Sequence, residues 1–265
     1  QTPKKIQVQG FDFFFTAGRL LVLAIIGCAL FFIKPLWAYV RKFFYTLSAA
    51  SQIGFAEVFG SFFSKPNMAA ILGFLLTFRL GEAQLAQVKN PFLLASREEM
   101  GLSLSLQEFA FTNGIVYLVA LTIGGILGGI LISAYGLKKT IWPMVAFMHL
   151  PNLLYIWLAW AQPDTLLPVN TVVAFESFGY GLGFTAYLMV MIFAAQGPYK
   201  TAHYALCTGA MALGYMIPGM WAGYLQELTG YTTFFVLVMI FVIPGILFIP
   251  FMKIDPSFGR REKST

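Results

Sequence analysis

The sequence predicts an all-α membrane protein, and three observations support this fold class. Of its 265 residues, 58% are hydrophobic and only 11% are charged, whereas soluble domains carry about 25% charged residues. The hydrophobic residues form long continuous runs without alternation, which argues against transmembrane strands. The basic residues, which give a net charge of +6, stand between these runs. That placement is typical of orientation signals in a bilayer and not of a nucleic-acid surface.

Seven runs are long enough, or nearly so, to cross a bilayer, which requires about 20 mostly apolar residues. They are Leu20–Val40, Met68–Val88, Phe109–Ala134, Ile141–Ala161, Val169–Ala195, Ala205–Leu225 and the slightly shorter Phe234–Met252. We expect the last six to form one bundle, over residues 68–252. We expect the first to be an accessory or linking helix within an N-terminal segment, residues 1–50.

Two further segments flank the predicted bundle. In residues 51–67, Phe55, Phe59 and Phe62 recur near a 3.6-residue period around Glu57 and Ser61, which predicts an amphipathic connector on the cytoplasmic membrane surface. Residues 253–265 form a basic tail. The chain begins QTPKK without an initiator Met or a signal-peptide cleavage site, so we interpret its start as a cut through a longer polypeptide.

The basic residues between the runs predict the orientation of the bundle. If residues 51–67 are cytoplasmic, ten Lys and Arg lie on that side, against only Lys89 and Arg97 on the other side after the first run. Lys4, Lys5 and Arg19, before the first run, would then lie outside. The ten are Arg41, Lys42, Lys65, Lys138, Lys139, Lys200, Lys253, Arg260, Arg261 and Lys263. This bias predicts a multi-pass membrane protein with a cytoplasmic C-terminus.

Small residues recur at four-residue spacing and predict close helix packing. The pairs are Gly124 with Gly128, Gly125 with Gly129, and Gly219 with Gly223. Small residues at this spacing let two backbones approach closely in lipid. They predict packing without predicting transport.

Ionisable residues within the runs are the candidate site. A charge at the bilayer centre costs at least about 2.5–3.5 kcal/mol on insertion scales, so it normally meets a polar pathway or a partner. Arg79 and Glu82 share a helix face at i, i+3. At about 1.5 Å per residue, Glu82 and Glu176 fall at similar depths in a core about 30 Å thick. His149 and Asn152 can line a cavity on a third helix, or form an interhelical hydrogen bond.

Two interpretations of these charges remain open. Either at least one carboxylate serves the solute or proton pathway, or an Arg79–Glu82 or Arg79–Glu176 ion pair only holds helices together. No P-loop, GxSxG, HExxH or CxxC motif is present, so no enzyme, cofactor or metal site is expected. Cys28 and Cys207 lie inside apolar runs and are expected to be small buried residues. His203 is expected at a solvated helix start.

Several runs resemble AmpG-type muropeptide permeases of the major facilitator superfamily, in the same order along the chain. They are Phe78–Ala83 (FRLGEA), Phe175–Ala186, His203–Leu206, Pro218–Gly223 and Gly230–Phe234. The loop Gly129–Lys139 resembles that superfamily's G-x-x-x-D-R-x-G-R-R motif, but Ser133 and Ala134 replace its Asp and first Arg. The resemblance covers about residues 55–252.

The resemblance implies six core helices, equivalent to the C-terminal half of a twelve-helix transporter whose N-terminal half is missing here. It implies proton-driven import of a small solute, of the anhydro-muropeptide type, through the lipid bilayer of a bacterial inner membrane. Similar proteins carry acetyl-CoA and other solutes, so a different solute, or a drug, is an alternative. A non-transporting membrane scaffold or sensor is the alternative from another class.

Overall fold

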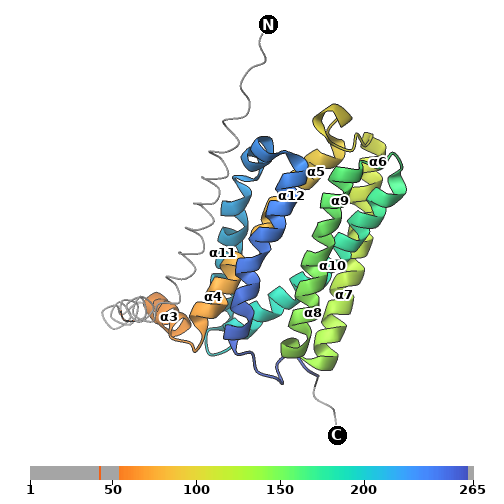
Figure 1. Cartoon of the computed structure of the whole chain (residues 1–265). Helices are drawn as coiled ribbons and strands as arrows, with labels where there is room; N and C mark the ends of the chain where they lie inside the picture. Colours follow the sequence, from red (N-terminus) through yellow and green to blue (C-terminus); the bar gives the residue numbers. More distant parts are fainter. Residues whose placement is uncertain (1–41, 43–53, 262–265) are drawn as a thin grey trace.

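A computed structural model describes residue 42 and residues 54–261. The predicted accessory helix, Leu20–Val40, lies outside these described residues. Within them all regular structure is helical, and the chain is an all-α membrane protein, as the sequence predicts (Figure 1). In chain order the elements are α3 (Gly54–Phe63), α4 (Met68–Thr77), α5 (Leu80–Leu94), η1 (Arg97–Glu99), α6 (Leu106–Phe111), η2 (Thr112–Val116), α7 (Tyr117–Tyr135), α8 (Leu137–His149), η3 (Leu150–Asn152), α9 (Leu153–Ala161), α10 (Leu166–Ala195), α11 (Lys200–Gly219), α12 (Ala222–Phe248) and η4 (Ile249–Met252).

Five helical spans of the described chain are long and apolar enough to cross a membrane. They are Met68–Leu94, Leu106–Tyr135, Leu137–Ala161, Leu166–Ala195 and Ala222–Met252. Each contains one predicted run and extends beyond it at one or both ends, because the helices continue through flanking polar residues. The five spans therefore lie where the corresponding apolar runs predict them, but each span is longer than its run.

The predicted run Ala205–Leu225 differs most from the structure. α11 ends at Gly219, and α12 begins only three residues later, at Ala222. Pro218 lacks the N–H that would continue the ladder, and its carbonyl accepts a hydrogen bond from Gln84 Nε2 at 2.5 Å. α11 is also absent from the apolar spans. Gly230, with φ 73°, then divides α12 into two helical pieces.

α10 is the central helix of the bundle and packs most extensively on α7 and α8, on one side of the view in Figure 1. A Cβ added to Gly124 would collide with the Phe178 carbonyl oxygen, and one added to Gly181 would collide with the Leu121 carbonyl oxygen. Gly124 is therefore a packing residue, as its spacing predicts. By contrast, Cβ atoms on Gly129 and Gly223 would meet no described atom within 4 Å.

The apolar core consists of two clusters, one above the other along the helices. One includes Phe78 and Leu182, and the other includes Leu85 and Val173. The chain passes from one cluster to the other between Phe78 and Leu85 on α4–α5, and between Val173 and Leu182 on α10. The predicted charged residues of these two spans lie in this interval.

α3 packs on the start of α11, and this contact corrects one prediction. His203 is 1% exposed, and its Nε2 lies 3.1 Å from both Ser61 Oγ and the Val58 carbonyl oxygen. The sequence suggested a solvated His203 because the residue lies near a helix start. The prediction is wrong because α3 covers that start.

The segment after η4 folds back on the turn between α7 and α8. The Leu137 amide donates to the Phe258 carbonyl at 3.0 Å, and the Arg261 amide donates to the Ser133 carbonyl at 2.9 Å. Phe258 also makes an edge contact with Phe193 of α10, with ring centroids 5.1 Å apart. The described part of the basic tail is therefore attached to the bundle.

Candidate functional site

The span Met68–Leu94, the first among the described residues, is interrupted where the site begins. α4 ends at Thr77 and α5 begins at Leu80, so Phe78 and Arg79 lie in a break within an otherwise apolar span. Glu82 lies in the first turn of α5, where the helix dipole favours a negative charge. Broken helices at membrane depth are tolerated where protein or a polar cavity satisfies the freed groups.

Arg79 and Glu82 form a bidentate ion pair at this break. Arg79 Nε donates to Glu82 Oε2 at 2.6 Å, and Nη2 donates to Oε1 at 3.0 Å. The same Nη2 donates to Tyr180 Oη on α10 at 3.1 Å. The guanidinium carbon lies 4.3 Å from the ring centre of Tyr215 and 5.1 Å from that of Phe184. The cation is thus held between aromatic faces, a favourable arrangement for guanidinium.

A second buried pair joins α5 to α10. Lys89 Nζ lies 3.0 Å from Glu176 Oε2, and the two residues are only 7% and 5% exposed. The Glu176 Oε2 atom also accepts longer hydrogen bonds, each 3.4 Å, from Tyr155 Oη and Ser177 Oγ. Lys89 Nζ lies 4.6 Å from the ring centre of Tyr117. Aromatic and hydroxyl groups therefore surround both charges.

This pair corrects two statements drawn from the sequence. Lys89 was expected in an outer loop, but α5 continues to Leu94 and places it inside the bundle. The predicted run ends at Val88, whereas α5 continues through Lys89, whose charge is paired with that of Glu176. Of the two suggested partners of Arg79, Glu82 forms the ion pair and Glu176 does not.

The two ion pairs lie between α5 and α10, and long side chains connect these helices, which are not closely packed on each other. We call this line of charged and aromatic residues the seam. Glu82 and Lys89 are seven residues apart, so they share a face of α5 and stand about 10 Å apart along its axis. Glu176 and Tyr180, four residues apart, share a face of α10. A buried ion pair is sensitive to the loss of either partner. In general, a carboxylate can accept a proton, and a cation that loses its carboxylate partner can bind another anion.

His149 and Asn152 lie beside this seam and are not hydrogen-bonded to its charged residues within the described chain. Both are 3% exposed, at the junction of α8, η3 and α9. The His149 ring meets the Phe78 ring at 68°, with centroids 5.0 Å apart. Neither ring nitrogen of His149 has a hydrogen-bond partner among the described residues. The third candidate helix therefore touches the break next to Arg79 through an aromatic contact.

The sequence reasoning missed Lys89, Tyr117, Tyr180, Phe184 and Tyr215 as site residues. Two signals were present: the seven-residue spacing of Glu82 and Lys89, and the four-residue spacing of Tyr180 and Phe184 on one face of the Gly-rich helix. Tyr215 carried no local signal, because only the packing of α11 brings it to Arg79. No group of three or more metal-ligating side chains occurs among the described residues.

A helical, multi-pass membrane protein with paired charges inside its spans is the class that this fold and site define. No protein-family model matches the chain. It is similar to the putative transporter AmpG 4 of Rickettsia conorii, with 26% identity over 195 residues that cover 74% of this chain and 45% of the relative. It is similar to the anhydromuropeptide permease of Escherichia coli, with 24% identity over 186 residues, 70% of this chain and 37% of the relative.

A third relative, the putative transporter AmpG 1 of Rickettsia felis, is 27% identical over 177 residues, 67% of this chain and 38% of the relative. These similarities confirm the predicted resemblance to AmpG-type transporters. In each comparison the match covers less than half the length of the curated relative.

Proposed function

We propose that the chain is the C-terminal half of a proton-coupled secondary transporter that imports anhydro-muropeptide-type solutes across a bacterial inner membrane. The observation that carries the proposal is the Lys89–Glu176 pair, which joins two membrane spans next to the Arg79–Glu82 pair. The E. coli relative, an anhydromuropeptide permease, supports the solute class. In a major facilitator the solute site lies between two halves, so a second half would complete it.

The residues of the seam suit such a solute. Arg79 and Lys89 are cations that a peptide carboxylate can bind, and guanidinium binds carboxylate in a bidentate manner. Tyr117, Phe184 and Tyr215 present aromatic faces next to these cations. Aromatic faces also stack on the apolar face of a sugar ring. A solute with a sugar and a peptide acid matches both features.

Coupling to protons is assigned to Glu176. Protonation of Glu176 removes the partner of Lys89, and an unpaired buried cation is costly. Lys89 must then find another anion, which an entering solute carboxylate can supply. Release of the proton restores the Lys89–Glu176 pair and displaces the solute. Proton and solute would thus cross the membrane together, because Lys89 exchanges its Glu176 partner for the solute carboxylate.

The test uses the full-length transporter in proteoliposomes with an imposed pH gradient and labelled anhydro-muropeptide. Glu176→Gln keeps the side-chain shape but removes the titration, so it should abolish accumulation while solute exchange at equal pH persists. The matched control is Glu227→Gln, because Glu227 is exposed near the start of α12, and it should behave as wild type.

Expression and uptake are measured together. Normal accumulation by Glu176→Gln would show that Glu176 is not the coupling group and would direct the same test to Glu82. If the wild-type protein neither accumulates nor exchanges the solute, the transport proposal fails and a scaffold or sensor role is favoured.

A further inference from the structure

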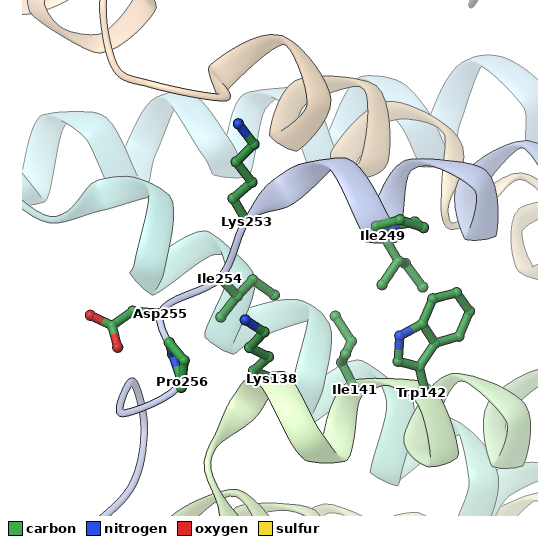
Figure 2. A pocket seen from close by; sticks show the side chains of 9 residues that line it. Lys138, Ile141, Trp142, Ile249, Lys253, Ile254, Asp255 and Pro256 are labelled. Atoms are coloured by element: carbon green, nitrogen blue, oxygen red, sulfur yellow. The ribbon is translucent and has the colours of Figure 1, made fainter.

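A groove separates the start of α8 from the segment that follows α12. It has a volume of about 620 Å³ and is lined by Lys138, Ile141 and Trp142 of α8, by η4, and by Lys253 and Asp255. Figure 2 shows Lys138 rising from α8 toward the segment that carries Ile254 and Asp255. The groove lies at the end of the bundle that carries the α7–α8 turn and the described tail (Figure 1).

The charges of this groove favour an anion. Lys138 and Lys253 are exposed, and neither forms a salt bridge with any described residue. Asp255 is the carboxylate of the lining, but its Oδ1 already accepts hydrogen bonds from Ser257 Oγ at 2.7 Å and Ser257 N at 2.8 Å. Those hydrogen bonds lower the pKa of Asp255, and the nearby positive charge of Lys138 lowers it further. The two lysines and one aspartate of the lining leave a net charge of +1. In Figure 2 its carboxylate points away from Trp142.

A second, apolar hollow continues along the same two helices. It has a volume of about 300 Å³ and shares Trp142 with the first. Its other lining residues include Ala146 on α8 and Met239 and Ile243 on α12, and it reaches His149. From Trp142 to His149 is seven residues, so this hollow extends about 10 Å further along α8. A free phosphate ion has no apolar group that could fill this extension, whereas a phospholipid has acyl chains that could.

We infer that this composite groove, from Lys138 and Lys253 to Met239 and Ile243, binds one anionic phospholipid, with its headgroup on the lysines and an acyl chain along α8 and α12. Basic pockets between membrane helices suit anionic headgroups, and each Lys near the membrane surface strengthens the attraction. Trp142, 48% exposed, lies at the junction, where an aromatic side chain suits the interface between headgroup and chain. If the C-terminus is cytoplasmic, as the sequence predicts, this end of the bundle lies at the inner leaflet, and lipid binding itself does not depend on the transport proposal.

The experiment titrates the purified 265-residue chain, in neutral detergent, with phosphatidylglycerol or phosphatidylcholine of identical acyl chains. Native mass spectrometry measures the bound lipid. We expect phosphatidylglycerol to bind at least about fivefold more tightly, and the double variant Lys138→Gln, Lys253→Gln to lose at least about fivefold of that affinity. The control Lys200→Gln, Arg261→Gln removes the same charge from exposed residues outside the groove, and its affinity should stay within about twofold of wild type.

Two further arms distinguish a lipid from a soluble anion. Ala146→Trp fills the apolar hollow from an exposed position and should weaken phosphatidylglycerol binding without changing the lysines. Inorganic phosphate at the lipid concentration should not displace the lipid. Equal binding of the two lipids, equal losses in both double variants, no loss in Ala146→Trp, or displacement by phosphate would each overturn the inference. Size-exclusion chromatography confirms that every variant compared is folded.

Discussion

Lys89 and Glu176 are 87 residues apart in the chain, yet their charged atoms lie 3.0 Å apart in the interior of the bundle. The pair connects the first membrane span to the central helix α10. Removing one partner leaves the other charge buried without compensation, whereas removing both does not. This asymmetry makes the pair testable by itself, without any assay of transport.

The Lys89–Glu176 pair should therefore show strong coupling in a double-variant cycle. Lys89→Met should destabilise the protein by about 3–5 kcal/mol, seen as a lower melting temperature in detergent and lower yield. Lys89→Met combined with Glu176→Gln should recover most of that loss, because the uncompensated charge is gone. If the double variant is as unstable as the sum of the single variants, the two residues do not interact in the folded protein.

Even the conservative substitution of Arg79 by lysine should impair transport. Arg79→Lys keeps the charge but loses the fork that binds Glu82 and the planar contact with Tyr215. Loss of one charge-assisted hydrogen bond costs about 1.5–3 kcal/mol, so uptake by the full-length transporter should fall at least about tenfold. Arg261→Lys, at an exposed position, provides the control. Unchanged uptake in Arg79→Lys would show that the positive charge of Arg79 is sufficient and that its planar guanidinium group is not required.

A single methyl group added at Gly124 should destabilise the contact of α7 with α10. A Cβ there collides with the Phe178 carbonyl oxygen, and backbone cannot move as a flexible side chain does. Gly124→Ala should cost about 1–3 kcal/mol, as overpacking does. Gly129→Ala, five residues further along the same helix, should be neutral. The melting temperatures of the two variants test this, and equal values would contradict the packing assigned to Gly124.

The C-terminus should face the cytoplasm. With Lys89 inside the bundle, the side predicted to be outside keeps only Arg97 from its original two basic residues, so the charge bias predicted from sequence becomes stronger. A reporter fused after Thr265 in the full-length protein should read cytoplasmic. A periplasmic signal would reverse the orientation and would move the proposed phospholipid site to the outer leaflet.

Local patterns predicted much of the fold and part of the candidate site. Continuous apolar runs placed the five spans, because burial in lipid requires apolar residues wherever a helix crosses. The contact of Arg79 with Glu82 follows from i, i+3 spacing, which needs no tertiary information. The helix bounds were less predictable, because a helix continues through polar residues that find partners inside the bundle, as α5 does through Lys89.

The remaining features depend on how the helices pack. Glu176 reaches Lys89 because the fold places α10 opposite α5, and nothing in the local sequence around either residue indicates the other. His203 is buried because α3 covers it, although its position near a helix start suggested solvent. The end of α11 at Gly219 also reflects a tertiary contact, between the Pro218 carbonyl and Gln84 of another helix.

The two hydrophobic clusters meet at the level where the helical ladder is interrupted, at Phe78–Arg79 and beside it at η3. Backbone amides in an interrupted ladder open more readily than those in a continuous helix. The core is thus stacked as two apolar tiers, and α10 passes through both as one continuous helix. Within the membrane spans, amide hydrogen exchange should therefore be faster at these two interruptions than in the middle of α10, which crosses the same level without a break.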